Sequence, residues 1–361
     1  MKMEPDITSL LRPSVKGLAP YRVERGGSRL KMDANESPYS WPPELLEEVV
    51  AELRGVELNR YPDPSAEGLR GILSEQLGVR PERIVLGNGS DELIQYLLLA
   101  FGGPEVKVLS PVPTFPMYEI VALATGCRFV GVPLDPGFDL DLEAMRAAID
   151  REAPRLLFLA YPNNPTGNCF RREFIVALLR EFEGLVMIDE AYFHFSRKSF
   201  IDLLDQHQNL LILRSLSKIG LAGLRVGFLV GGERIIEAVC RVRLPYNVNT
   251  FSQVAARIIL SRDEFVRRQV EILVAERERL FRELQSRAGI HPFPSEANFI
   301  LFRAPKAETI FEGLRSRGIL VRSFDGSGPL RDHLRVTVGK PEENDLFLEA
   351  MDALIEEGGV V

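Results

Sequence analysis

Short apolar runs that alternate with helix-like segments dominate the sequence between residues 83 and 231. The runs are rich in Val, Ile, Leu and Phe, and the segments between them carry apolar residues at helical spacing. Strands that take turns with helices predict an α/β domain in which helices cover both faces of a parallel sheet. The expected strands are 83–89, 106–110, 128–134, 156–162, 184–192, 210–217 and 225–231. The expected helices among them are 90–101, 114–125, one that begins at Asp141 and one near 172–182.

The chain on either side of this region is organised differently. Residues 1–43 are rich in proline, glycine and charge and show little periodicity, so we expect an arm rather than a core element. Beyond residue 261, apolar residues keep the spacing of a long amphipathic helix that ends near Gly289. NFILFR, GILVRSF and HLRVTVG then predict short strands, and a final helix follows. We therefore expect an arm (1–43) that packs with the small domain and the active site, a large domain (44–250) and a small α+β domain (251–361).

Composition narrows the function classes. A chain of 361 residues with 45% hydrophobic content can bury a large core. Its net charge of −7 and pI near 5.4, with no run of Lys or Arg, argue against a nucleic-acid partner. No apolar run is long enough for a membrane span or a signal peptide, so we expect no membrane association. Three widely spaced cysteines and four scattered histidines favour neither disulfides nor a metal site, and a cytoplasmic location fits best.

Polar residues directly after apolar strands are informative, because ligands bind at the carboxyl ends of the strands in a parallel sheet. GNGSDE (87–92) follows a strand and begins a helix. Its two glycines let the backbone approach an anion, and the free N–H groups of Ser90 and Asp91 would point at that anion. The segment predicts a phosphate cradle. A dinucleotide site is disfavoured because the third glycine of G-x-G-x-x-G is missing, whereas a plain turn capped by Ser90 stays open.

Three further segments carry polar residues after strands. YPNNPTGN (161–168) forms a rigid loop and is also compatible with an ordinary turn. MIDEAY (187–192) brings Asp189 to the sheet edge, where an aspartate can keep a ring nitrogen protonated. A nucleotide hydrolase could also use such an acid, but G-x-x-x-x-G-K-[ST] does not occur. LRSLSKIGLAGLRVG (213–227) holds Lys218, whose interior position is explained by a Schiff base, with a surface loop lysine as the alternative.

These four segments agree on one ligand. A phosphate cradle, a polar loop, a buried acid and a lysine beside serine and arginine together suit pyridoxal 5′-phosphate (PLP). At these residues the chain closely resembles the fold-type I aminotransferases and, within them, the histidinol-phosphate aminotransferase family. The similarity spans nearly the whole chain, through DANESP, NRYPDP, GNGSDE, PTFPMY, YPNNPTG, DEAYFHF, SLSKIGLAGLRVG, PYNVN, EANFILF and LRVTVG. It implies a PLP-dependent transferase fold of type I, with a mostly parallel seven-stranded sheet flanked by helices and a smaller α+β domain.

The resemblance also implies how the cofactor is held. Lys218 would carry the cofactor and would shuttle a proton once the substrate amine has released it. Asp189 would pair with the ring nitrogen, and Phe115 would stack on the ring. Asn164 and Tyr192 would hydrogen-bond the phenolate oxygen of the cofactor. The phosphate would be bound by Ser90, Asp91, Ser215, Ser217 and Arg225.

The same resemblance implies the partners and the reaction. Tyr61 would reach the cofactor phosphate from the neighbouring subunit, which implies a homodimer with shared active sites. Arg322 and Arg335 would bind the phosphate or carboxylate of the substrate through planar forks. Residues around the substrate would also include Tyr21, Asn35, Asn164, Tyr246 and Asn247, although each could instead pack at a domain interface. The implied activity is transamination between L-histidinol phosphate and 2-oxoglutarate, giving imidazole-acetol phosphate and L-glutamate in histidine biosynthesis.

Other activities remain open. L-threonine-phosphate decarboxylase and an aromatic-amino-acid aminotransferase share the fold, and a few pocket contacts decide between such substrates. A non-catalytic PLP-binding regulator is disfavoured, because the residues before the α/β region are too few for a DNA-binding domain. One departure concerns the loop from Lys218 to Arg225, which is one residue shorter than in many aminotransferases. The loop geometry around Ile219 and Gly220 is therefore open.

Overall fold

The central element of the computed structural model is a seven-stranded sheet; the residues described are 7–20, 29–324 and 328–358. Its order is β2-β8-β7-β6-β5-β3-β4. The strands are β2 (Ile84–Gly87), β3 (Lys107–Val112), β4 (Arg128–Pro133), β5 (Leu156–Ala160), β6 (Leu185–Asp189), β7 (Leu210–Ser215) and β8 (Gly227–Gly231). All seven predicted strands are present. β8 runs antiparallel to both of its neighbours, and the other strands of the sheet run parallel to one another. The mostly parallel seven-stranded sheet is therefore confirmed.

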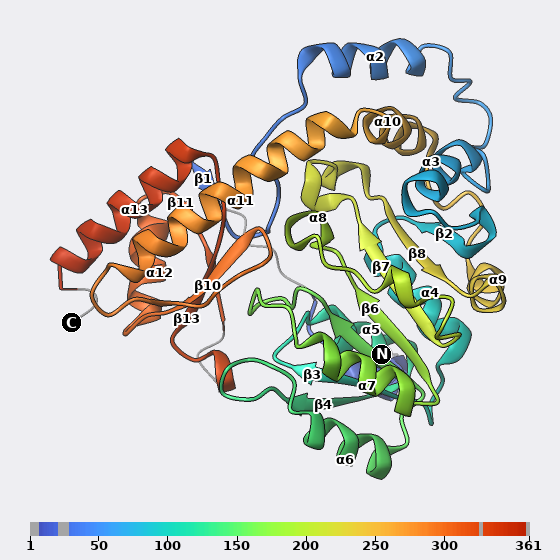
Figure 1. Cartoon of the computed structure of the whole chain (residues 1–361), viewed down its shortest axis with the longest axis horizontal. Helices are drawn as coiled ribbons and strands as arrows, with labels where there is room; N and C mark the ends of the chain where they lie inside the picture. Colours follow the sequence, from blue (N-terminus) through green and yellow to red (C-terminus); the bar gives the residue numbers. More distant parts are fainter. Residues whose placement is uncertain (1–6, 21–28, 325–327, 359–361) are drawn as a thin grey trace, which may run out of the picture.

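Helices cover both faces of this sheet (Figure 1). Side chains alternate across each strand, so that Leu156 and Phe158 of β5 join one apolar cluster while Leu157 and Leu159 join the other. The first cluster includes residues of α4 (Ser90–Phe101), α5 (Met117–Thr125) and α9 (Glu233–Val242). The second includes residues of α6 (Leu142–Glu152) and α7 (Arg172–Glu181). The sheet is therefore buried on both faces, as predicted.

A second sheet lies in the C-terminal part of the chain. Its four antiparallel strands have the order β12-β13-β10-β9. They are β9 (His291–Pro292), β10 (Phe299–Arg303), β12 (Arg322–Ser323) and β13 (His333–Thr337). The helices α11 (Asp263–Gln285), α12 (Ala307–Ser316) and α13 (Pro341–Glu356) belong to this part. The predicted apolar residues of α11 are buried, namely Val266, Val270, Leu273, Leu280 and Leu284, and the helix ends four residues before Gly289.

The N-terminal segment contributes to the core. β1 (Leu30–Lys31) pairs in parallel with β11 (Ile319–Leu320), and Leu30 and Met32 are buried in the larger apolar cluster. The pairing with β11 agrees with an arm that packs on the small domain. The sequence did not indicate that this stretch also joins the core, because two residues of strand are too short to show a periodicity. The remaining helices are α1 (Pro13–Lys16), α2 (Pro43–Leu53), α3 (Glu67–Leu77), α8 (Phe193–Ser196) and α10 (Thr250–Leu260).

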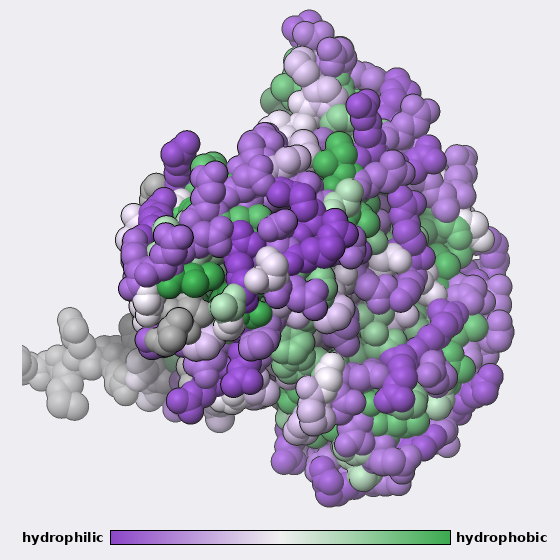
Figure 2. Space-filling model, turned by 60° about the vertical axis from the view of Figure 1, so that its left-hand side comes forward, coloured by the Kyte–Doolittle hydropathy of each residue, from purple (hydrophilic) through white to green (hydrophobic). Residues whose placement is uncertain are grey.

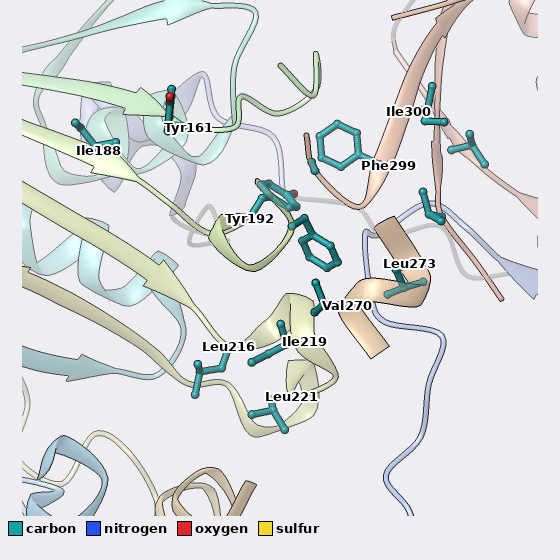
Figure 3. Packing of buried hydrophobic residues seen from close by; sticks show 14 of the residues in the cluster. Tyr161, Ile188, Tyr192, Leu216, Ile219, Leu221, Val270, Leu273, Phe299 and Ile300 are labelled. Carbon is teal, nitrogen blue, oxygen red and sulfur yellow. The ribbon is translucent and has the colours of Figure 1, made fainter. Parts of the chain in front are cut away.

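Apolar packing continues from the large sheet into the C-terminal part. The rings of Tyr192 and Phe299 meet edge to face, with centroids 5.2 Å apart, and Val270 and Leu273 of α11 lie nearby (Figure 3).

Polar side chains cover most of the outer face shown in Figure 2, with scattered apolar ones between them. Within the described ranges, no helix combines the length and apolar character needed to cross a lipid bilayer.

Candidate active site

A cavity of about 510 Å³ opens at the carboxyl ends of the central strands. Ala160, Asp189 and Ser215 line it, and they are the last residues of β5, β6 and β7. This is the edge of the sheet where ligands are expected. The other predicted site residues that line the cavity are Asn35, Ser90, Asp91, Phe115, Asn164, Tyr192, Ser217, Lys218, Arg225, Arg322 and Arg335.

Lys218 enters the cavity from the short turn that follows β7. The turn is a 3₁₀ helix (Ser217–Ile219), and Gly220 ends it with a φ of +90°. The Lys218 Nζ donates a long hydrogen bond of 3.4 Å to the carbonyl oxygen of Ala34. Burial lowers the Lys218 pKa, and the positive charge of Arg335 lowers it too, so that the pKa is about 8. A lysine in this position is more often a neutral amine, and so a better nucleophile, than an exposed one.

Asp189 presents a buried carboxylate at the end of β6. Its Oδ2 accepts a hydrogen bond of 2.8 Å from the Tyr118 hydroxyl, and its Oδ1 accepts one of 3.0 Å from the Ala191 N–H. Burial raises the Asp189 pKa and these hydrogen bonds partly offset the rise, so that the pKa is about 6. A carboxylate held this way pairs readily with a cationic ring nitrogen.

The Tyr118 contact was missed from the sequence. The residue lies in the quoted PTFPMY motif and is fully buried on α5. Its ring meets Phe115 edge to face, with centroids 5.6 Å apart. The signal that could have revealed it is a tyrosine at an otherwise apolar core position, because a buried hydroxyl requires a partner.

The predicted phosphate cradle is formed where β2 leads into α4. Gly89 has a φ of +89°, and a Cβ placed on it would meet the guanidinium of Arg225. A Cβ on Gly227 would lie 2.5 Å from the Ser90 backbone nitrogen. Ser215 and Ser217 are buried beside this turn. Helix N–H groups, hydroxyls and a guanidinium therefore converge on one space, which favours an anion.

A second group of polar contacts lies across the cavity. The Arg335 guanidinium donates to Asn164 Oδ1 and, at 2.6 Å, to the carbonyl oxygen of Asp33. The Asn35 Nδ2 donates to the Tyr192 hydroxyl at 2.8 Å. Burial raises the Tyr192 pKa to about 12. Arg322 of β12 lies opposite Arg335 of β13 in the strand register, so the two predicted substrate arginines are neighbours.

Other predicted residues do not line the cavity. Tyr61 and Tyr246 are 79% and 39% exposed, and their rings stack with centroids 4.4 Å apart. Asn247 instead supports the cradle from behind, because its Nδ2 donates to Glu92 Oε2 at 2.6 Å and to the Leu86 carbonyl oxygen. Tyr21 lies outside the described residues.

Comparison with known proteins identifies the family. The family model for class I and II aminotransferases matches residues 28–351. The chain belongs to the class I and II aminotransferase family. This aminotransferase is 45% identical to histidinol-phosphate aminotransferase 2 of Nitrosococcus oceani, over 96% of this chain and 98% of the relative. It is 44% identical to histidinol-phosphate aminotransferase of Aquifex aeolicus, over 95% of this chain and 97% of the relative.

Solved structures confirm the aminotransferase fold. Histidinol-phosphate aminotransferase from Sinorhizobium meliloti, in complex with pyridoxal-5′-phosphate, superposes with a TM-score of 0.87 at 27% identity. The alignment covers 97% of this chain and 98% of that structure. L-threonine-O-3-phosphate decarboxylase from Porphyromonas gingivalis has a TM-score of 0.77 at 23% identity, which shows a shared fold alone. The predicted fold type and enzyme class are therefore confirmed.

Proposed function

We propose that this chain is a PLP-dependent aminotransferase that transfers the amino group of L-histidinol phosphate to 2-oxoglutarate. The products are imidazole-acetol phosphate and L-glutamate, and the reaction is a step of histidine biosynthesis. The observation that carries this proposal is the name shared by relatives that match nearly end to end at 45% and 44% identity. The family match and the pyridoxal-5′-phosphate in the S. meliloti relative support PLP as the cofactor.

The cavity fits this cofactor. The end of the cavity next to the turn at Gly89 would take the phosphate. The residues that would bind that phosphate are Ser90, Asp91, Ser215, Ser217 and Arg225. Asp189 would pair with the ring nitrogen, and Phe115 would lie against the ring. When bound, the cofactor supplies an electron-accepting ring that stabilises negative charge on the substrate Cα.

Lys218 would carry the cofactor and move the substrate proton. Its Nζ lies 5.8 Å from the centre of the Tyr192 ring, inside the cavity that Asp189 and Arg335 also line. With a pKa of about 8, the released side chain is a neutral amine in about one molecule in ten at pH 7, far more often than an exposed lysine. Such an amine would accept the proton from the substrate Cα and return it later, which is general acid–base catalysis.

Arg322 and Arg335 would select anionic substrates. They face the same cavity from neighbouring strands, and hydrogen bonds to Asn164 and to Asp33 fix the orientation of Arg335. Planar guanidinium forks suit both the phosphomonoester of histidinol phosphate and the carboxylate of glutamate. The substrate roles of Tyr21, Tyr246 and Asn247 stay predictions.

A homodimer with shared active sites is supported by an exposed aromatic surface. The stacked pair of Tyr61 and Tyr246 is accompanied by exposed Leu58 and Leu244. The two segments that carry these residues are in contact, because the Arg243 Nη1 donates to the Pro64 carbonyl oxygen at 2.9 Å. Exposed aromatic residues of this kind are enriched at protein interfaces. Tyr61 would thereby reach the cofactor phosphate of the partner subunit. The cytoplasmic location stays a prediction.

The proposed function is tested by the colour of the purified protein. We expect a visible PLP band that changes when L-histidinol phosphate is added, with release of imidazole-acetol phosphate and no CO₂. Lys218→Ala should abolish this response. A band that answers to threonine phosphate with release of CO₂, or to phenylalanine alone, would overturn the proposed substrate. Absence of any band after PLP is added would overturn the whole assignment.

A further inference from the structure

A buried hydrogen-bond chain leads from the C-terminal sheet to the wall of the cavity. Its members are Thr337 at the end of β13, Asn35 on the segment after β1, and Tyr192 after β6. The exposed fractions of these residues are 4%, 2% and 4%. Each hydrogen bond in the chain is therefore formed away from bulk water, where losing a partner is costly.

Thr337 holds Asn35 by two hydrogen bonds. The Asn35 backbone N–H donates to Thr337 Oγ1 at 3.0 Å, and the Thr337 hydroxyl donates to Asn35 Oδ1 at 3.2 Å. Asn35 has a φ of +55°, a left-handed conformation that asparagine tolerates better than most residues. Asn298 adds a third constraint, because its Nδ2 donates to the Asn35 carbonyl oxygen at 3.1 Å.

These contacts decide which way the Asn35 amide points. The Thr337 hydroxyl has one proton, and it donates that proton to Asn35 Oδ1. If the amide were rotated by half a turn, that proton would lose its acceptor inside the core. The observed orientation instead directs the Asn35 Nδ2 to the Tyr192 hydroxyl, at 2.8 Å.

The orientation of the amide then determines what Tyr192 can do. Because its oxygen accepts a hydrogen bond from Asn35, the proton of the Tyr192 hydroxyl is free to point elsewhere. Tyr192 lines the cavity, so that proton is available to an acceptor bound there. With the amide reversed, the same proton would be donated to Asn35 and withdrawn from the cavity.

We propose that Thr337 is a positioning residue that, through Asn35, makes Tyr192 a hydrogen-bond donor toward the cofactor. The inference rests on the proposed function, in which the phenolate oxygen of PLP is the acceptor. A donor to that oxygen stabilises the deprotonated form of the Lys218-bound cofactor and lowers the pH at which its visible band titrates. Thr337 therefore affects the titration midpoint of the visible band without contacting the cofactor, because it acts through Asn35.

The test is a pH titration of the visible band in Thr337→Val, which removes the hydroxyl and keeps the shape. The midpoint should rise by about one to two pH units, the size expected for losing a hydrogen bond to a charged group. Thr337→Ser, which keeps the hydroxyl, should restore the wild-type midpoint. A variant that acts only on stability would change thermal unfolding without moving this midpoint.

A double-mutant cycle gives the coupling directly. Tyr192→Phe should raise the midpoint by itself, and adding Thr337→Val to it should cause no further rise. If Thr337→Val does not fold, Asn35→Asp replaces it, because a carboxylate has no N–H and would take the Tyr192 proton. An unchanged midpoint in Thr337→Val, or an equal rise in the Tyr192→Phe background, would overturn the inference. A wild-type protein without a PLP band, or inert to histidinol phosphate, would instead overturn the proposed function.

Discussion

At the scale of single residues, the pKa values of two ionisable groups are shifted toward neutral pH, one upward and one downward. Burial raises the Asp189 pKa to about 6 and lowers the Lys218 pKa to about 8, because each group is disfavoured in its charged form. Such displaced pairs are typical of catalytic sites. The cofactor-free protein therefore keeps groups in its cavity that would be more stable in water.

Replacing Asp189 by Asn should stabilise the cofactor-free protein near pH 8. The Asp189 pKa is about 6 in the folded chain against 3.8 for an aspartate in water, so its stabilising contribution is complete below pH 3.8 and is lost as pH rises through 6. A displacement of about two pKa units corresponds to about 3 kcal/mol. Thermal unfolding without PLP should show a larger gain for Asp189→Asn at pH 8 than at pH 5. An equal gain at both values would contradict this account, and the variant with PLP should be nearly inactive.

At the scale of elements, an ion pair joins β6 and β7 behind the site. Glu190 follows Asp189 and Arg214 precedes Ser215, and alternation along the chain turns both side chains away from the cavity. The Arg214 Nη2 donates to Glu190 Oε2 at 2.8 Å, and both side chains are almost fully buried. The guanidinium also lies 3.6 Å from the centre of the Phe193 ring. The pair thus holds the two strand ends that present Asp189 and Ser215.

Arg214→Met should destabilise the protein by about 3–5 kcal/mol, because it leaves the Glu190 carboxylate buried without its partner. Chemical unfolding measures this loss. Adding Glu190→Gln to Arg214→Met should recover part of the stability, since the second change removes the uncompensated charge. If the double variant were less stable than Arg214→Met, the ion pair would not be the cause.

The turn before α4 gives a second prediction at this scale. In Gly89→Ala, the new Cβ meets the Arg225 guanidinium at a φ of +89°, so the cradle must distort. Backbone strain of this kind should weaken PLP binding about tenfold to a hundredfold. Gly71→Ala is the matched control, because nothing lies within 4 Å of its new Cβ in α3. The control should bind PLP normally and gain about 0.5–1 kcal/mol. Equal PLP affinity in both variants would contradict a cradle at Gly89.

At the scale of the whole molecule, hydrophobic pattern and turn chemistry predicted the seven strands and their carboxyl edge. Strand direction was less accessible, because periodicity alone does not show that β8 runs antiparallel. Two-residue strands such as β1 and β11 are too short to produce a pattern. The contacts of Tyr118 with Asp189 and of Asn35 with Tyr192 join segments far apart in sequence, and no local signal encodes such pairs.

The shared-site dimer predicts complementation between two damaged chains. Lys218→Ala and Tyr61→Ala proteins should each be weakly active or inactive alone. In a mixed dimer, the site with an intact Lys218 receives an intact Tyr61 from its partner, so random mixing should restore about a quarter of the sites. Activity after unfolding and refolding the mixture measures this. No recovery, with dimers present, would show that Tyr61 acts within its own subunit or not at all.

The pairing of β1 with β11 has a consequence for how the protein is made. Residues 30–31 leave the ribosome well before their hydrogen-bond partners at 319–320 are synthesised. Domains tend to fold as their residues emerge from the ribosome. The central sheet, whose last strand ends at residue 231, can therefore form while β1 is still unpaired. Asn35 can contact both Tyr192 and Thr337 only after residue 337 has been synthesised. The central sheet therefore forms before the active site is complete. A chain that stops before residue 337 would be folded in large part but inactive.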